Sequence, residues 1–115
     1  MTDNATMTIS ELAKAIITLA SEKKVMLVLA ESCTGGMIAA ALTDIAGSSA
    51  VLDRGLVTYS NQAKQDLLGV SDDILASHGA VSAETAVAMT TGALLKTPAA
   101  QLAASVTGIA GPGGG

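Results

Sequence analysis

A serine, a lysine and a tyrosine in this sequence have the types and spacing that nucleophilic catalysis needs. Ser32 stands in the polar, glycine-containing segment 31–36, and Tyr59 stands shortly before Lys64. A serine hydroxyl is a weak nucleophile until a base takes its proton, and a lysine can be that base when burial lowers its pKa. We therefore expect Ser32 to face a substrate carbonyl, Lys64 to act as its base, and Tyr59 to relay a proton or to hold the lysine.

Each of these residues also has a structural interpretation that the sequence leaves open. Ser32 or Thr34 can cap the helix expected to follow them. Lys64 can be an exposed helix residue, and Tyr59, the only aromatic residue of the chain, can pack in the core.

Other side chains offer weaker routes to catalysis. Cys33 is a rival nucleophile, because thiolates at helix amino ends have lowered pKa values, but a small buried thiol is the simpler interpretation. His78, the only histidine, precedes Gly79 at an expected helix end, which favours a cap or a surface residue. One histidine and one cysteine do not make a zinc site. We expect neither a metal nor another cofactor.

Glycines at two places can bring a ligand close to the backbone. Gly35 and Gly36 precede an expected helix, where the N–H groups of residues 34–36 would suit an oxyanion or a phosphate. The run from Gly108 to Gly115 can cradle a phosphate or be a flexible end. Either segment would serve as the phosphate site.

These segments need strands and helices that bring them together. Apolar runs predict strands at 25–30, 56–59 and 102–106. Capping serines and apolar periodicity predict helices at 10–23, 37–46, 62–68, 71–78 and 82–96. This alternation indicates one three-layer α/β domain, with a mostly parallel sheet flanked by helices, in which the loops after the strands converge. We interpret residues 1–115 as such a domain that has lost its C-terminal part after the glycine-rich loop.

Composition limits the classes of partner and the cellular compartment that we expect. The net charge of −4 argues against nucleic-acid binding, and the apolar runs are shorter than the ~20 residues that span a membrane. A single cysteine fits a reducing compartment, so we expect a bacterial cytoplasmic protein. With 50% hydrophobic residues but one aromatic, the core must be small, which favours a homo-oligomer.

Five strings of the sequence resemble the CinA C-terminal family, in that family's order. They lie at residues 30–36, 44–49, 57–64, 78–82 and 107–112. The resemblance implies an α/β fold and hydrolysis of the carboxamide of nicotinamide mononucleotide, which gives nicotinic acid mononucleotide and ammonia. It implies Ser32 as the nucleophile, supported by Lys64 and Tyr59. The substrate-binding residues that we expect are Thr34, Gly35, Gly36, Asn61, Thr107, Gly108 and Gly111.

Two alternatives to this amidase remain open at the level of the sequence. One is a non-catalytic nucleotide-binding or regulatory module with the same loops, and the other is an amidase of different specificity. A binding module needs the glycines but no lysine buried beside a serine, so the presence of Ser32, Tyr59 and Lys64 favours the enzyme. Its expected partner is a small nucleotide substrate.

Overall fold

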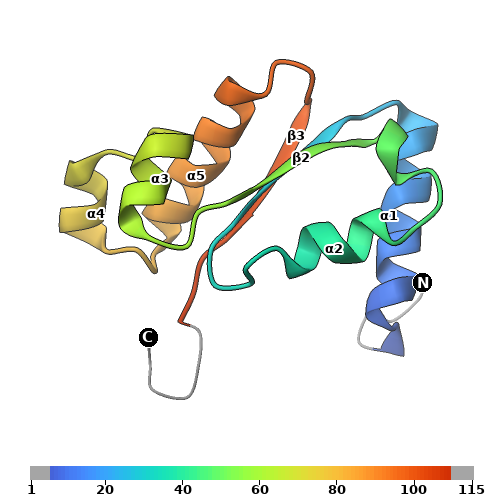
Figure 1. Cartoon of the computed structure of the whole chain (residues 1–115), viewed down its shortest axis with the longest axis horizontal. Coiled ribbons are helices and arrows are strands. Elements are labelled where there is room, and N and C mark those ends of the chain that lie inside the picture. Colours follow the sequence, from blue (N-terminus) through green and yellow to red (C-terminus); the bar gives the residue numbers. More distant parts are fainter. Residues whose placement is uncertain (1–5, 110–115) are drawn as a thin grey trace.

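The computed structural model describes residues 6–109, which form a three-stranded parallel sheet covered by helices on both faces (Figure 1). The elements are, in chain order, α1 (Ile9–Lys23), β1 (Leu27–Glu31), α2 (Met37–Thr43), a 3-10 turn (Ser48–Ala50), β2 (Leu52–Val57), α3 (Asn61–Leu68), α4 (Asp72–His78), α5 (Ala83–Lys96) and β3 (Leu102–Val106). The predicted α/β class and parallel sheet are confirmed. None of the helices within residues 6–109 is long and apolar enough to cross a membrane.

Strand β1 lies at the centre of the sheet, between β2 and β3, and is parallel to both. All five of its residues are buried, because helices cover both of its faces. Leu27 and Leu29 pack with α1 and α2, whereas Val28 and Ala30 pack with α3 and α5. A strand buried on both faces needs apolar side chains in succession, which explains the continuous apolar run.

Helix α5 packs closely against the end of α3. A Cβ atom added to Gly92, in the middle of α5, would meet the carbonyl oxygen of Leu68 closer than atoms can approach. The glycine therefore lets the two backbones touch, and this contact helps to fix α3 over the sheet.

The predicted caps and ends of the last three helices are confirmed. Ser60, Ser71 and Ser82 each accept a backbone N–H at the start of α3, α4 and α5, as expected of capping serines. Gly69 ends α3 in the left-handed conformation. Strand β3 also has its predicted bounds.

Several boundaries differ from the prediction. Strand β1 spans Leu27–Glu31 and not 25–30, and strand β2 ends at Val57 and not at residue 59. Helix α1 is capped by Thr8 and not by Ser10, because Glu11 completes a capping box with Thr8. Helix α2 ends at Thr43, before Gly47. Strand β2 begins earlier than expected, at Leu52, and tolerates polar side chains because most of its residues are exposed at the edge of the described sheet.

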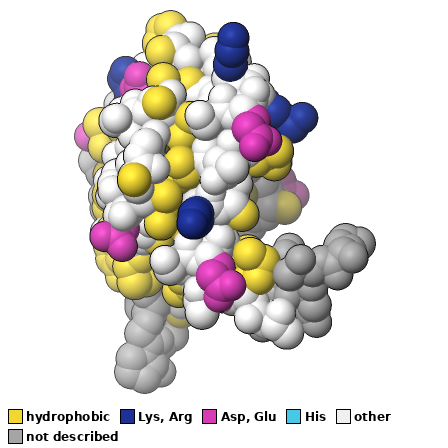
Figure 2. Space-filling view, turned by 90° about the vertical axis from the view of Figure 1, so that its right-hand side faces the viewer, with side chains coloured by type: hydrophobic (Ala, Val, Ile, Leu, Met, Phe, Trp, Pro, Cys, Tyr) yellow, Lys and Arg dark blue, Asp and Glu magenta, His cyan; other side chains and the backbone are white. Residues whose placement is uncertain are grey.

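One face of the molecule exposes hydrophobic side chains. Figure 2 shows them among scattered charged groups on the side where α1 lies. An apolar groove runs between α1 and α2, and Ile9, Ile16 and Met37 on its walls are largely exposed. Self-association, which the composition favours, stays a prediction.

Candidate active site

A cavity of about 300 Å³ lies where the loops after the strands meet. Because the strands are parallel, their carboxyl ends share one edge of the sheet, which is where sites form in such folds. The predicted convergence of the three loops is therefore confirmed, and the connection between α4 and α5 adds a fourth wall. The lining residues are Ser32, Cys33, Tyr59, Asn61, Lys64, Ala80, Val81, Thr107, Gly108 and Ile109.

Lys64 and Ser32 are in direct contact in this cavity. The Lys64 Nζ lies 3.0 Å from the Ser32 Oγ and 3.0 Å from the carbonyl oxygen of Thr58. It also lies 3.2 Å from the carbonyl oxygen of Tyr59. The Ser60 cap starts α3 so that Lys64, in its first turn, points back toward the sheet, and only 1% of the lysine is exposed.

The surroundings of Lys64 favour the neutral amine. Burial lowers the pKa of Lys64, and the charge of a Cys33 thiolate acts in the opposite direction with a smaller effect. Within residues 6–109 the ion pairs are Arg54–Asp53 and His78–Glu84, so no carboxylate there balances the lysine charge. A lysine with a lowered pKa next to a serine hydroxyl can act as a general base.

Tyr59 borders the cavity but contacts the lysine through its backbone. Its carbonyl oxygen accepts hydrogen bonds from Lys64 and, at 3.5 Å, from the Ser32 Oγ. The side chain is 65% exposed, and its phenol has no hydrogen-bond partner among the described residues. This geometry supports the expectation that Tyr59 holds the lysine. It does not support a proton relay through the phenol, because the phenol is hydrogen-bonded to neither Ser32 nor Lys64.

Glu31, which the sequence analysis did not single out, is buried at the end of β1 with its carboxylate against the start of α2. The Oε1 atom accepts hydrogen bonds from the Thr34 hydroxyl at 2.6 Å and from the N–H groups of Ile38 at 3.0 Å and Gly36 at 3.2 Å. The Oε2 atom accepts the N–H of Ala39 at 2.9 Å. Burial raises the pKa of the Glu31 carboxyl, but these hydrogen bonds outweigh burial and hold the pKa below its usual value. The sequence signal that could have identified Glu31 is a charged residue at the end of an apolar strand, shortly before a helix.

The backbone N–H groups of the first glycine segment therefore donate to acceptors within the chain. The N–H of Gly35 donates to the carbonyl oxygen of Ser32, and the N–H of Gly36 donates to Glu31. Neither glycine lines the cavity, and nor does Thr34. The expectation that these three residues bind the substrate stays a prediction, and the hydrogen bonds above count against it.

The loop after β3 contributes Thr107 and Gly108 to the cavity, as expected, and Asn61 contributes an exposed wall. The Thr107 hydroxyl donates to the carbonyl oxygen of Ala80 at 2.6 Å, which ties this loop to the α4–α5 connection. A Cβ atom on Gly108 would lie 3.1 Å from the Cys33 Sγ, so the glycine allows the two loops to approach closely. Gly111 lies outside the described residues.

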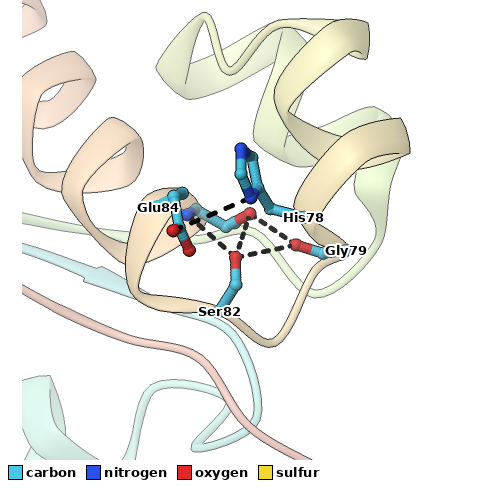
Figure 3. A network of polar contacts seen from close by, with 5 residues as sticks. His78, Gly79, Ser82 and Glu84 are labelled. Carbon is cyan, nitrogen blue, oxygen red and sulfur yellow. Dashed lines mark hydrogen bonds and ion pairs between the residues drawn. The ribbon is translucent and has the colours of Figure 1, made fainter.

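A polar network spans the connection between the end of α4 and the start of α5 (Figure 3), and Ala80 and Val81 of this connection line the cavity. The carbonyl oxygen of Gly79 accepts hydrogen bonds from the Ser82 hydroxyl at 3.1 Å and from the Thr85 hydroxyl at 2.5 Å. His78 lies at the end of α4, with its Nδ1 3.7 Å from the Glu84 carboxylate. The histidine is outside the cavity lining, which agrees with its interpretation as a cap or a surface residue.

The sequence of residues 9–115 matches that of the CinA C-terminal domain. The chain belongs to the CinA C-terminal domain family. The resemblance drawn from the five strings is thereby confirmed.

Several members of the CinA family are similar over most of this chain. The protein named nicotinamide-nucleotide amidohydrolase PncC from Escherichia coli K12 is 49% identical over 115 residues, which are 100% of this chain and 67% of that protein. A putative competence-damage inducible protein from Caldicellulosiruptor bescii is 53% identical over 104 residues, 90% of this chain and 25% of that protein. The chain thus spans between a quarter and two thirds of these two relatives.

Solved structures of CinA proteins share the fold. The competence/damage inducible protein CihA from Agrobacterium tumefaciens superposes with a TM-score of 0.86 at 57% identity, over 93% of this chain and 64% of that one. A CinA superfamily protein from Escherichia coli superposes with a TM-score of 0.91 at 36% identity, over 100% of this chain and 65% of that one. The described α/β arrangement is therefore that of the CinA family.

Proposed function

We propose that this chain hydrolyses the carboxamide of nicotinamide mononucleotide to nicotinic acid mononucleotide and ammonia. The observation that carries the proposal is the buried Lys64 Nζ at 3.0 Å from the Ser32 Oγ, inside a cavity at the carboxyl edge of the sheet. The similarity to the Escherichia coli amidohydrolase, over the whole of this chain, supports the choice of substrate.

In the first half of the reaction, neutral Lys64 takes the proton of the Ser32 hydroxyl while the Oγ forms a bond to the amide carbon. A backbone N–H group beside the serine stabilises the oxyanion. The carbon–nitrogen bond then breaks, Lys64 returns the proton to the leaving nitrogen, and ammonia departs. The product of this half is an ester between Ser32 and the nicotinoyl group.

In the second half, a water molecule replaces ammonia. Lys64 takes a proton from the water, whose oxygen attacks the ester carbon, and the proton returns to the Ser32 Oγ as the ester bond breaks. The carboxylate product leaves with the rest of the nucleotide unchanged. Lys64 can carry every proton transfer of this reaction.

The size of the cavity suits one part of the substrate. A volume of about 300 Å³ is at the lower end for ligand pockets, and it fits the pyridine ring and carboxamide better than the whole nucleotide. We propose that the exposed ring of Tyr59 covers the pyridinium, and that Asn61, Thr107 and Gly108 contact the sugar side. The phosphate then lies on the side of Gly108.

The test is ammonia release from nicotinamide mononucleotide by the wild-type protein and by Ser32→Ala. We expect turnover in the wild type and none in Ser32→Ala, with the exposed Ser10→Ala as a matched control that keeps full activity. Turnover that survives in a folded Ser32→Ala protein would remove the serine from the mechanism. A folded wild type without turnover on this substrate would leave a nucleotide-binding module or an amidase of another specificity.

A further inference from the structure

The buried carboxylate of Glu31 fills a position where a helix usually offers free N–H groups. The first turn of a helix has N–H groups without partners inside the helix, and these favour bound anions. In α2 the N–H groups of Gly36, Ile38 and Ala39 donate to Glu31 instead. The start of the helix is thus occupied by an anion that belongs to the chain itself.

Of the remaining amides of this turn, two have internal acceptors, whereas those of Cys33 and Thr34 have none among residues 6–109, and Thr34 does not line the cavity. Gly35 donates its N–H to the carbonyl oxygen of Ser32, and Met37 donates its N–H to the carbonyl oxygen of Thr34. The N–H of Cys33 has no acceptor among residues 6–109, and Cys33 lines the cavity. Cys33 directly follows Ser32, and in hydrolases with a serine at a strand-to-helix turn this following N–H is an oxyanion donor.

We propose that Glu31 is a positioning residue that fills the start of α2 and holds the turn of Ser32, so that the backbone N–H of Cys33, and not the helix end, receives the oxyanion. The proposal rests on the amidase function proposed above. It assigns the phosphate of the substrate to a place away from α2, because the charge of Glu31 would repel it there.

The position of Glu31 in the sheet explains how one carboxylate can set the geometry of the reaction. Its carbonyl oxygen accepts the N–H of Thr58 at 2.7 Å, and the next N–H, that of Ser32, donates to Val106 at 3.0 Å. The backbone before the serine is therefore fixed by both neighbouring strands. The carboxylate fixes the turn after the serine, so that the Ser32 Oγ stays at Lys64 and the N–H of Cys33 stays at the cavity.

The first experiment compares Glu31→Gln with Glu11→Gln in the wild-type background. Glu11 is a matched control, because its carboxylate also accepts a backbone N–H at a helix start, that of Thr8, but on α1 and outside the cavity lining. We expect kcat to fall about a hundredfold in Glu31→Gln, the effect of a small misplacement of reacting groups, with KM unchanged. We expect Glu11→Gln to keep both values.

Two results of this comparison would overturn the proposal. An unchanged kcat in a folded Glu31→Gln protein would show that the carboxylate does not position the serine. A fall in KM at an unchanged kcat would show that the start of α2 is the phosphate site, relieved of a repelling charge. The split between kcat and KM, measured well below the unfolding temperature, separates positioning from a loss of stability.

A second variant and a second substrate keep the test independent of folding and of the amidase. Thr34→Val removes the 2.6 Å hydrogen bond to Glu31 but keeps the carboxylate, and we expect a smaller loss of kcat in the same direction. The burst of nitrophenol from p-nitrophenyl acetate reports acylation of Ser32 without any nucleotide. A burst that Glu31→Gln slows, in a protein without amidase activity, would refute the amidase and retain the positioning role. A folded wild type with neither a burst nor ammonia release would refute both.

Discussion

The Nζ of Lys64 lies 3.0 Å from the Oγ of Ser32, although the two residues are 32 positions apart in the chain. Three acceptors surround the amine, namely this hydroxyl and the carbonyl oxygens of Thr58 and Tyr59. An ammonium group can donate to all three, whereas a neutral amine can donate to the two carbonyls and accept the proton of the serine. Both protonation states therefore find partners without movement of the side chain, which is what a proton carrier needs.

Replacement of the lysine tests this role directly. We expect Lys64→Met to lower kcat about a thousandfold, since a general base contributes between a hundredfold and ten-thousandfold. Lys64→Arg should fail as well, because a guanidinium does not give up its proton at neutral pH. Ammonia release is the measurement, with the exposed Lys14→Met as the control. Retained activity in Lys64→Arg would argue against proton transfer by this residue.

The pH dependence of kcat follows from the direction of the lysine pKa. In the proposed mechanism the active form is the neutral amine, so we expect activity to rise with pH and to level off below the range in which an ordinary lysine titrates, near 10.4. Cys33→Ala removes the influence that raises the pKa of Lys64, so the rise should move to lower pH. His78→Asn, outside the cavity lining, should leave the profile unchanged. A shift to higher pH in Cys33→Ala would contradict the assignment.

Two substitutions of Tyr59 separate a binding ring from a proton relay. We expect Tyr59→Phe to keep kcat, because the phenol has no hydrogen-bond partner within residues 6–109. Tyr59→Ala should raise KM for nicotinamide mononucleotide about tenfold, the effect of losing an aromatic face over a cation. Steady-state kinetics on both variants measure this. If Tyr59→Phe loses as much kcat as the lysine variant, the phenol takes part in the proton transfer after all.

The glycine of α5 gives a prediction about stability. Alanine is preferred over glycine inside helices by about 1 kcal/mol, but the added methyl of Gly92→Ala would collide with the Leu68 carbonyl. We expect the collision to prevail and to lower the free energy of unfolding by about 3 kcal/mol. Urea denaturation measures this, with Thr91→Ala on the exposed side of the same helix as the control. A neutral Gly92→Ala would mean that α3 can shift away from α5 without loss.

Local signals explain why much of the fold could be predicted from the sequence. The caps at Ser60, Ser71 and Ser82 depend on a side chain and a backbone N–H three residues later, so the sequence shows them directly. Strand β2 was placed too late because Asp53 and Arg54 interrupt its apolar pattern. An edge strand can carry such exposed polar residues, but the sequence does not say which strand lies at an edge.

The candidate site could likewise be predicted only in part. Ser32 and Lys64 could be paired because each follows a predicted strand, and parallel strands end at one edge of the sheet. The role of the Tyr59 carbonyl could not be foreseen, since every residue has a carbonyl and its direction depends on the fold. Glu31 escaped notice because only the packing of β1 against α2 shows that its carboxylate turns inward and meets the helix.

The central place of β1 has a consequence for how the chain folds as it is synthesised. One neighbour of β1 is β2, but its other neighbour is β3, which lies at Leu102–Val106 near the end of the described segment. Long-range parallel pairing of this kind slows folding. A ribosome-bound chain therefore displays one side of an apolar strand until nearly all of residues 6–109 have emerged, and during that interval aggregation competes with folding. We expect chaperones that bind short apolar segments to bind β1 during this interval.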